Sequence, residues 1–170
     1  MARYRIDPKR SHVWIDARSN VHPIHTEADG LDGWLELDIR DGKINLDLAP
    51  RGHLEFSVEN LISGKALEDR ELRRRIDSRR FPMIAGDLKL MKAHNGEAGL
   101  VVNGDLTFRG VTRSYEDQMT FEGLDGEAVK LTGQSTFDIR DFGMEPPRIL
   151  MLKVQPEVMV RVEIVAEKES

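Results

Sequence analysis

Apolar and polar residues alternate along most of this chain. In the clearest stretch, from Val158 to Ile164, every even position carries a branched apolar side chain, while Arg161 and Glu163 occupy odd positions. Successive side chains of a β-strand point to opposite faces, so this pattern predicts a strand with one apolar and one polar face. About nine segments repeat it, which indicates an all-β protein.

Residue parity gives the apolar faces of the other predicted strands. They lie in residues 13–17, 35–39, 44–48, 54–58, 88–90, 100–108, 115–121 and 129–139. Gly104 and Gly133 belong to two of these faces, where they would either leave room inside or mark bends. Asp117 interrupts the row in residues 115–121, and we attribute it to a shift of register or a β-bulge.

Asp-Gly and Asn-Gly dipeptides separate these segments at short intervals. Glycine accepts a positive φ, and Asn or Asp tolerates one, so these dipeptides predict turns. The pairs are Asp29-Gly30, Asp32-Gly33, Asp41-Gly42, Asn95-Gly96 and Asp125-Gly126. Because an apolar sheet face must be covered, the strands either close into a barrel or pack as two sheets. About eight strands can form a barrel, which is filled by its own side chains or holds one small ligand.

Residues 66–76 break the alternation and predict a short helix. Their side chains are good helix formers, and Leu72 and Ile76 lie one turn apart. Ser63-Gly64 before the segment and Phe81-Pro82 after it are suitable boundaries. A single helix among antiparallel strands suggests a lid or plug at one end of a barrel.

Length and composition limit the classes of function. The chain has 170 residues, and we treat residues 1–170 as one domain. A net charge of -5, from 25 basic and 30 acidic residues, argues against nucleic-acid binding. The chain has no cysteine, which excludes disulfides, thiolate catalysis and cysteine-based metal sites. It shows neither a secretory signal pattern nor an apolar run of about 18 residues, so a soluble, cytoplasmic protein is expected.

Four segments carry sequence patterns that go beyond alternation. Residues 4–7 and 11–13 open the chain, and the predicted helix lies between Ser63-Gly64 and Phe81-Pro82. Residues 104–112 read Gly-Asp-Leu-Thr-Phe-Arg-Gly-Val-Thr, and residues 139–143 read Ile-Arg-Asp-Phe-Gly. With the last strand from Val158, these segments resemble the YceI-like family, the lipocalin-like polyisoprenoid-binding proteins. The third is similar to the family's Gly-x-Leu-Thr-x-x-Gly-Val-Thr signature. The fourth is similar to its Arg-x-Asp-Phe-Gly element, except that Arg140 and Asp141 are adjacent.

The resemblance implies an extended, antiparallel eight-stranded barrel around an apolar tunnel that holds an isoprenoid chain, such as a polyprenol or a quinone tail. Many members of the family are exported, whereas no signal pattern is present here. Apolar side chains with the right parity would form a dry wall for this ligand. These candidates are Val13, Ile15, Leu37, Phe56, Val102, Phe108, Met119, Phe121, Leu131, Phe137 and Val160. The alternative is that the same side chains simply fill the barrel.

An arginine-rich stretch accompanies the predicted helix. Guanidinium groups bind phosphate through two parallel hydrogen bonds, so Arg73, Arg74 and Arg75 are candidates for holding a polyprenyl phosphate head group or touching an anionic membrane surface. The alternative is a solvated helix face whose arginines pair with Glu68, Asp69, Glu71 and Asp77. Arg140 and Asp141 are expected to form a charge-assisted pair at a structural corner.

Histidines raise the question of a metal site. His22 and His25 are close in sequence, and His12 and His53 lie elsewhere. Their spacing matches no recognised zinc motif, so we assign His22 and His25 to a loop and predict no metal. A carboxylate such as Glu27 or Asp29 close to them in space would revive the metal hypothesis.

No nucleophile elbow, phosphate-binding loop or dinucleotide fingerprint is present, so no enzyme is predicted. The leading hypothesis is a carrier or buffer for an isoprenoid lipid, with transient membrane contact during loading. A second is an interaction module with a filled barrel, acting through its surface or as a homodimer, for which Trp14 and Met159 on polar faces are candidate contacts. A third is a histidine-dependent metal protein or enzyme.

Overall fold

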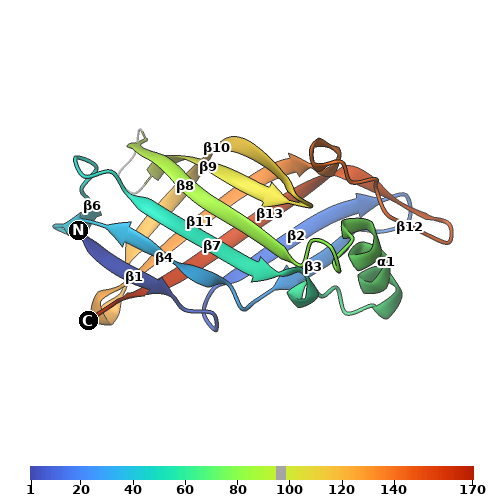
Figure 1. Ribbon diagram of the computed structural model, residues 1–170, viewed down its shortest axis with the longest axis horizontal. Helices are drawn as coiled ribbons and strands as arrows, with labels where there is room; N and C mark the ends of the chain where they lie inside the picture. Colours follow the sequence, from blue (N-terminus) through green and yellow to red (C-terminus); the bar gives the residue numbers. More distant parts are fainter. Residues whose placement is uncertain (95–98) are drawn as a thin grey trace.

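Antiparallel strands wrap around a long axis and close on themselves in the computed structural model, which describes residues 1–94 and 99–170 (Figure 1). The long strands are β1 (Ala2–Ile6), β2 (His12–Ser19), β3 (Ile24–Ala28), β4 (Asp32–Leu37), β7 (Arg51–Ser57), β8 (Met83–Ala93), β9 (Gly99–Phe108), β10 (Val111–Gly123), β11 (Ala128–Asp138) and β13 (Leu152–Lys168). Shorter elements are β5 (Ile39–Arg40), β6 (Lys43–Ile44), β12 (Arg148–Ile149), the helix α1 (Ala66–Ile76) and the 3-10 turns η1 (Val58–Asn60), η2 (Asp125–Glu127) and η3 (Ile139–Phe142). The predicted turn at Asn95-Gly96 lies outside the described residues.

The long last strand, β13, closes the barrel. One edge pairs with β11, and the other pairs with β1 near the C-terminal end and with β2 further back. β1 and β2 therefore act as one interrupted strand, and β3 and β4 do the same beside them. With β7, β8, β9, β10, β11 and β13 they make eight strand positions. The predicted lipocalin-like eight-stranded barrel is confirmed, and the two-sheet alternative is wrong.

The barrel has two unlike ends. One carries both chain termini and the β5–β6 hairpin, and we call it the terminal end (Figure 1). The other carries α1, β12 and η3, and we call it the helix end.

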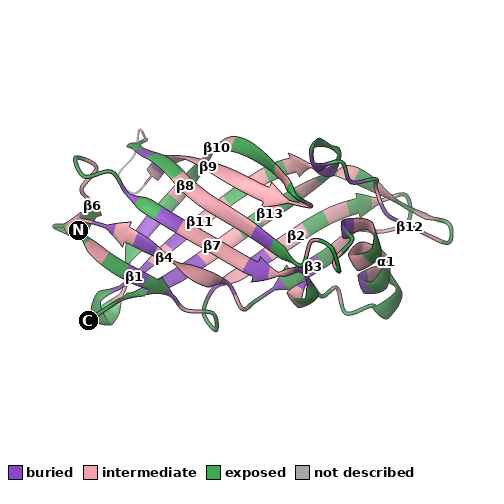
Figure 2. Cartoon of the chain, in the orientation of Figure 1, coloured by how far each residue is buried: buried purple, intermediate pink, exposed green. Residues whose placement is uncertain are grey.

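Side chains pack tightly across the terminal end. Ile6 and Leu37 are fully buried there, and Leu35, Phe121 and Ala166 are nearly so. These residues belong to strands that pair around this end, and Figure 2 shows buried positions recurring along β1, β4 and the neighbouring part of β11. Branched and aromatic side chains thus form a solid core in this part of the barrel.

The helix α1 has the predicted bounds and lies across the helix end. Leu72 and Ile76 face the barrel, and Ile76 is almost fully buried. Acidic residues in its first turn and arginines in its last complement the helix dipole, which stabilises the short helix. Within the described residues, no helix has the length and apolar character needed to cross a membrane.

Two predicted strand faces are corrected by the structure. A β-bulge between Leu88 and Leu90 shifts the pairing with β9, so Leu90 turns outward and Met91 takes the buried position. Only Ile44 of residues 44–48 lies in a strand, because the chain turns after the β5–β6 hairpin and Asn45 bonds back to Asp38.

Other predicted boundaries also change. Val58 and Ile139 are buried as predicted but begin 3-10 turns rather than continuing strands. Asp32-Gly33 lies inside β4 instead of forming a turn, because Gly33 packs against the backbone of His53 on β7. His25, assigned to a loop, lies on β3.

Candidate functional site

A mostly apolar cavity of about 400 Å³ occupies the barrel between the terminal-end core and α1. Its deep part is lined by Ile6, Leu35 and Met91, and its other limit includes Leu72 of α1 and Ile149 of β12. Protein interiors seldom leave voids much larger than a water molecule, so this space is a structural feature rather than a packing defect. The barrel is therefore hollow over the part nearer the helix end.

Most of the predicted wall residues line this cavity. Nine do so, namely Val13, Ile15, Phe56, Val102, Phe108, Met119, Leu131, Phe137 and Val160. Leu37 and Phe121 do not, because they belong to the core of the terminal end. Parity identified the inward face correctly, but it contained no information about where along the barrel the packed core stops.

Glycines help to keep the cavity open. Gly86 on β8 lines it, and a Cβ atom there would meet no side chain within 4 Å. Gly104 on β9 has a different role, because a Cβ atom there would lie 2.9 Å from the carbonyl oxygen of Asp87. The first glycine leaves volume inside the barrel, and the second permits close approach of two strands.

The signature in residues 104–112 joins the cavity wall to the helix. Leu106 and Phe108 line the cavity. At the following turn, the Arg109 guanidinium donates to the carbonyl oxygen of Ile76 at 3.3 Å, and to those of Phe142, at 3.2 Å, and Gly143. Ile76 ends α1 and Phe142 ends η3, so Arg109 fastens both to the barrel. No side-chain pattern in the sequence predicts this role of Arg109.

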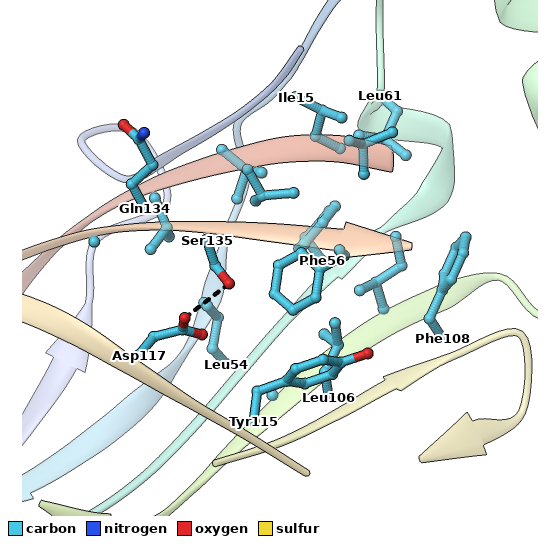
Figure 3. A pocket seen from close by; sticks show the side chains of 18 of the residues that line it. Ile15, Leu54, Phe56, Leu61, Leu106, Phe108, Tyr115, Asp117, Gln134 and Ser135 are labelled. Carbon is cyan, nitrogen blue, oxygen red and sulfur yellow. Dashed lines mark hydrogen bonds between the residues drawn. The ribbon is translucent and has the colours of Figure 1, made fainter. Parts of the chain in front are cut away.

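Asp117 projects into the cavity from β10. The pairing of β10 with β9 runs through Asp117 without a shift of register, so the predicted bulge is wrong. Ser135 Oγ on β11 donates to Asp117 Oδ1 at 2.8 Å (Figure 3). Burial raises the pKa of the Asp117 carboxyl above its ordinary value, and the bond from Ser135 opposes that rise only in part. Simple parity already placed Asp117 inside, and that signal was the correct one.

Tyr115 adds a second polar group to the same face of β10. Its ring packs edge-on against Phe137, with centroids 4.7 Å apart, and lies near Phe142. Its hydroxyl oxygen is almost fully enclosed and has no hydrogen-bond partner among the described residues. Burial raises the pKa of Tyr115, so the hydroxyl keeps its proton.

Comparison with known proteins identifies the family. A family model described as the YceI-like domain matches residues 4–166.

The chain belongs to the YceI-like family.

A UPF0312 protein of Pseudomonas fluorescens is 30% identical over 162 residues, covering 86% of this chain and 78% of that protein. Among solved structures, a polyisoprenoid binding domain from Saccharophagus degradans matches with a TM-score of 0.77 at 13% identity, covering 99% of this chain and all of that one. BcnA of Burkholderia cenocepacia also has a TM-score of 0.77, at 14% identity, with 94% and 98% covered. These structures support the fold.

The candidate arginines of this YceI-like barrel are engaged in ion pairs. Arg74 and Arg75 both bond to Glu71, at 2.8 and 2.9 Å, and Arg75 also reaches Glu145 at 2.9 Å. Arg73 lies 3.2 Å from Glu59. None of the three lines the cavity. The arginines are thus paired with acids, as in the alternative hypothesis of a solvated helix face. Glu71 is one of the expected partners, whereas Glu59 and Glu145 were not expected.

The charged side chains around the YceI-like cavity are mainly acidic. Glu68 and Asp69 line it at the helix end, where Asp69 accepts a hydrogen bond from the backbone of Ser63 at 2.8 Å. Asp117 lines it further inside. Among the described residues, the lining contains no lysine or arginine. The histidine of this lining, His53, has both ring nitrogens bonded to acids, Asp87 and Glu55, so an anionic group inside the barrel would meet mainly negative charge.

The corner at residues 139–143 is structural, but the predicted ion pair is wrong. The side chain of Arg140 is largely exposed and bonds to Asp138 at 2.7 Å. Asp138 also caps η3 by accepting a hydrogen bond from the backbone N–H of Arg140, which brings the two residues together. Asp141 instead offers its carbonyl oxygen to Arg113 at 3.0 Å.

The histidines of the YceI-like barrel lie in separate places. His25 pairs with Asp16, and His53 lies between Asp87 and Glu55. His22 is 3.9 Å from Glu68, and His12 stacks on Trp14. Across residues 1–94 and 99–170, no group of three histidines or acids is placed to hold a metal ion.

Trp14 and Met159 lie on the outer face, as predicted. The Arg161 guanidinium covers the Trp14 ring at 4.4 Å, which reduces the apolar surface available to a partner. Met159 is partly exposed. A homodimer through this patch stays a prediction.

Proposed function

We propose that this protein binds an isoprenoid lipid in the barrel cavity and stores or transports it. The tail would belong to a polyprenol, a polyprenyl phosphate or a quinone. The observation that carries the proposal is the apolar cavity of about 400 Å³ inside a member of the YceI-like family. The structural neighbour from Saccharophagus degradans, described as a polyisoprenoid binding domain, supports the choice of ligand.

The energetics favour a long apolar ligand. Each methylene group transferred from water into such a cavity gains about 0.8 kcal/mol, before the cost of ordering the chain. On β13, lining residues run from Val154 to Ile164, which spans roughly 30 Å along the strand. The cavity volume falls within the range of roughly 300–1,000 Å³ found for ligand pockets. A narrow, long and mostly apolar space suits a single prenyl tail.

We propose that the chain acts by binding rather than by catalysis. The family and the named neighbour favour a binding protein. The Ser135 hydroxyl bonds to the Asp117 carboxyl rather than to a histidine, and no third group that orients the pair is found among the described residues, so the arrangement differs from a hydrolytic triad. A cytoplasmic location stays a prediction, and cell fractionation would test it.

A membrane surface is the proposed source of the lipid. Leu150 and Met151, at the tip of the β12–β13 hairpin, are 94% and 83% exposed. Arg148 and Lys153 flank them in sequence and would be attracted to anionic lipid head groups. The tip is fixed in place, because Asn20 Nδ2 donates to the carbonyl oxygen of Met151 at 3.0 Å. It lies at the helix end, next to the lining residue Ile149.

Native mass spectrometry of the protein purified without detergent tests the proposal. A prenyl lipid should be retained by the wild type and lost from Val102→Trp, because the larger side chain enters the cavity. Val101→Trp is the matched control, since Val101 is adjacent on β9 and has the opposite parity. Gly86→Val is a second filling variant, at a position with free space. A folded wild type that binds no prenyl lipid, even when offered one, would refute the function.

A further inference from the structure

Three polar residues of the cavity wall lie on the adjacent strands β10 and β11, apart from the acids at the helix end. Asp117 and Tyr115 lie two residues apart on β10, and Ser135 is beside Asp117 on β11 (Figure 3). The Tyr115 hydroxyl points away from the Asp117 carboxyl (Figure 3), so the polar contact available to one small chemical group is the Asp117–Ser135 pair. The surroundings are apolar, with Phe56 and Leu106 nearby in the same view.

These polar groups have unused hydrogen-bonding capacity. A carboxyl group offers several acceptor positions, and Asp117 uses one of them for Ser135 among the described residues. The Tyr115 hydroxyl has no partner at all within the same part of the chain, although its oxygen is almost fully enclosed. Buried polar groups normally find partners, so a ligand or ordered water is the expected complement.

The charges select the kind of ligand head. Glu68, Asp69 and Asp117 are acidic and line the cavity, whereas the described lining holds no cationic lysine or arginine. Arg73, Arg74 and Arg75 are held by carboxylates outside it. A phosphate in the barrel would be repelled by acids and would lack the guanidinium or ammonium partner that usually binds it.

We propose that Asp117 and Ser135 hold an uncharged, hydrogen-bonding head group of the bound prenyl lipid and that the cavity rejects a phosphate head. This inference rests on the proposed function and narrows its ligand class to the uncharged members, polyprenols and quinones. Burial raises the pKa of the Asp117 carboxyl because its charge is costly inside the barrel; a head-group hydroxyl that donates to the carboxylate would offset part of that cost, whereas a phosphate would add to it. The head would then lie within the barrel wall rather than at the arginines of α1.

Two probes with the same tail test the head-group preference. Geranylgeraniol carries a hydroxyl, and geranylgeranyl phosphate carries a phosphate. Competition binding at neutral pH should show the alcohol binding at least about tenfold more tightly to the wild type, because juxtaposed like charges strongly disfavour a partner. Equal or tighter binding of the phosphate would overturn the inference and leave the proposed function intact. Binding of neither probe would instead count against the proposed function.

Variants assign the preference to the site. Asp117→Asn keeps the size of the side chain but removes its charge, so the preference for the alcohol should fall at least about fivefold. Glu116→Gln is the matched control, since it removes one charge from the adjacent residue on β10, which does not line the cavity. Ser135→Ala should weaken binding of geranylgeraniol about fivefold and provides the test if Asp117→Asn does not fold. A preference that is unchanged in the folded variants would overturn the inference.

Discussion

His53 Nδ1 on β7 lies 2.7 Å from Asp87 Oδ1 on the adjacent strand β8. Glu55 approaches the other ring nitrogen at 3.2 Å. The hydrogen bond to Asp87 is the main cause of a raised pKa for His53, with Glu55 adding to it against partial desolvation.

The His53–Asp87 pair makes folding stability dependent on pH. The folded pKa is raised above about 6.5, the value expected for the unfolded chain, so the stabilisation is fully present below about pH 6.5 and is lost as pH rises through the folded value. A loss of about 0.3–1 kcal/mol is expected for such a partly exposed pair. Urea unfolding of the wild type on both sides of that pH should show it, and His53→Gln should abolish the difference. An equal pH dependence in the variant would contradict the assignment.

Asp117 should also make stability fall as pH rises, and its buried charge should destabilise the fold near neutral pH. Its folded pKa is raised by burial, so the folded state binds a proton more tightly than the unfolded state does. The free energy of unfolding therefore increases as pH falls through the folded pKa towards about 3.9, the value expected for the unfolded chain. Above that range the charged carboxyl destabilises the folded state. Asp117→Asn should raise the free energy of unfolding at neutral pH and lose this advantage in acid. Glu116→Gln should show no such pH-dependent gain.

Leucine truncations should distinguish the packed part of the barrel from the hollow part. Leu37 is fully buried in the terminal-end core, and Leu37→Ala should cost about 2–5 kcal/mol of unfolding free energy. Leu106 lines the cavity, so it has fewer neighbours to lose, and Leu106→Ala should cost less than half as much. Chemical denaturation of ligand-free protein measures both changes. Equal costs would mean that the cavity collapses around its wall in solution.

Arg109 should control how firmly α1 is held. Arg109→Gln removes the guanidinium that donates to the carbonyl oxygens of Ile76 and Phe142, at an expected cost of about 1.5–3 kcal/mol. Hydrogen exchange in α1 should accelerate in this variant. Arg113→Gln is the control, because Arg113 is exposed and bonds to Asp141 without touching α1. Unchanged exchange in Arg109→Gln would show that other contacts hold the helix.

The β12–β13 tip should determine lipid transfer from membranes. Replacing Leu150 and Met151 with serine removes the two most exposed large apolar side chains described. Uptake of a fluorescent prenyl alcohol from phosphatidylglycerol vesicles should slow several-fold, since each side chain contributes roughly 1.5–3 kcal/mol when fully buried. Leu48→Ser alters an exposed apolar residue at the terminal end and should leave uptake unchanged. Uptake that is equally fast in the double variant would exclude this contact.

Residue alternation predicted the strands and most of the inner face because strand geometry is local, whereas the choice of a barrel over two packed sheets came from the family resemblance. Alternation could not reveal the bulge at Leu88 and Leu90, since the bulge depends on pairing with β9. It also could not separate Leu37 and Phe121 from the cavity wall, because packed and hollow sections of one barrel have the same parity.

Chemistry inside the barrel was harder to predict than shape. Parity placed Asp117 on the inward face, which is correct. Because burying a carboxyl is costly, we instead predicted a bulge that would turn it outward, and the regular pairing of β10 with β9 excludes that bulge. Arg109 acts through backbone carbonyl oxygens of segments distant in sequence, and such acceptors leave no trace in side-chain spacing. The arginines of α1 were paired with acids that the chain brings close only after folding, including Glu59 and Glu145.

The solid core at the terminal end has a consequence for selectivity under the proposed function. It gives the cavity a fixed floor near Ile6, Leu35 and Met91. If the head of the lipid binds at Asp117, the distance between Asp117 and this floor sets the length of tail that the cavity can enclose. Longer chains would have to extend past α1 at the helix end. Small changes at the floor could retune the accepted chain length, while the wall at Asp117 separately governs what chemistry the chain may carry.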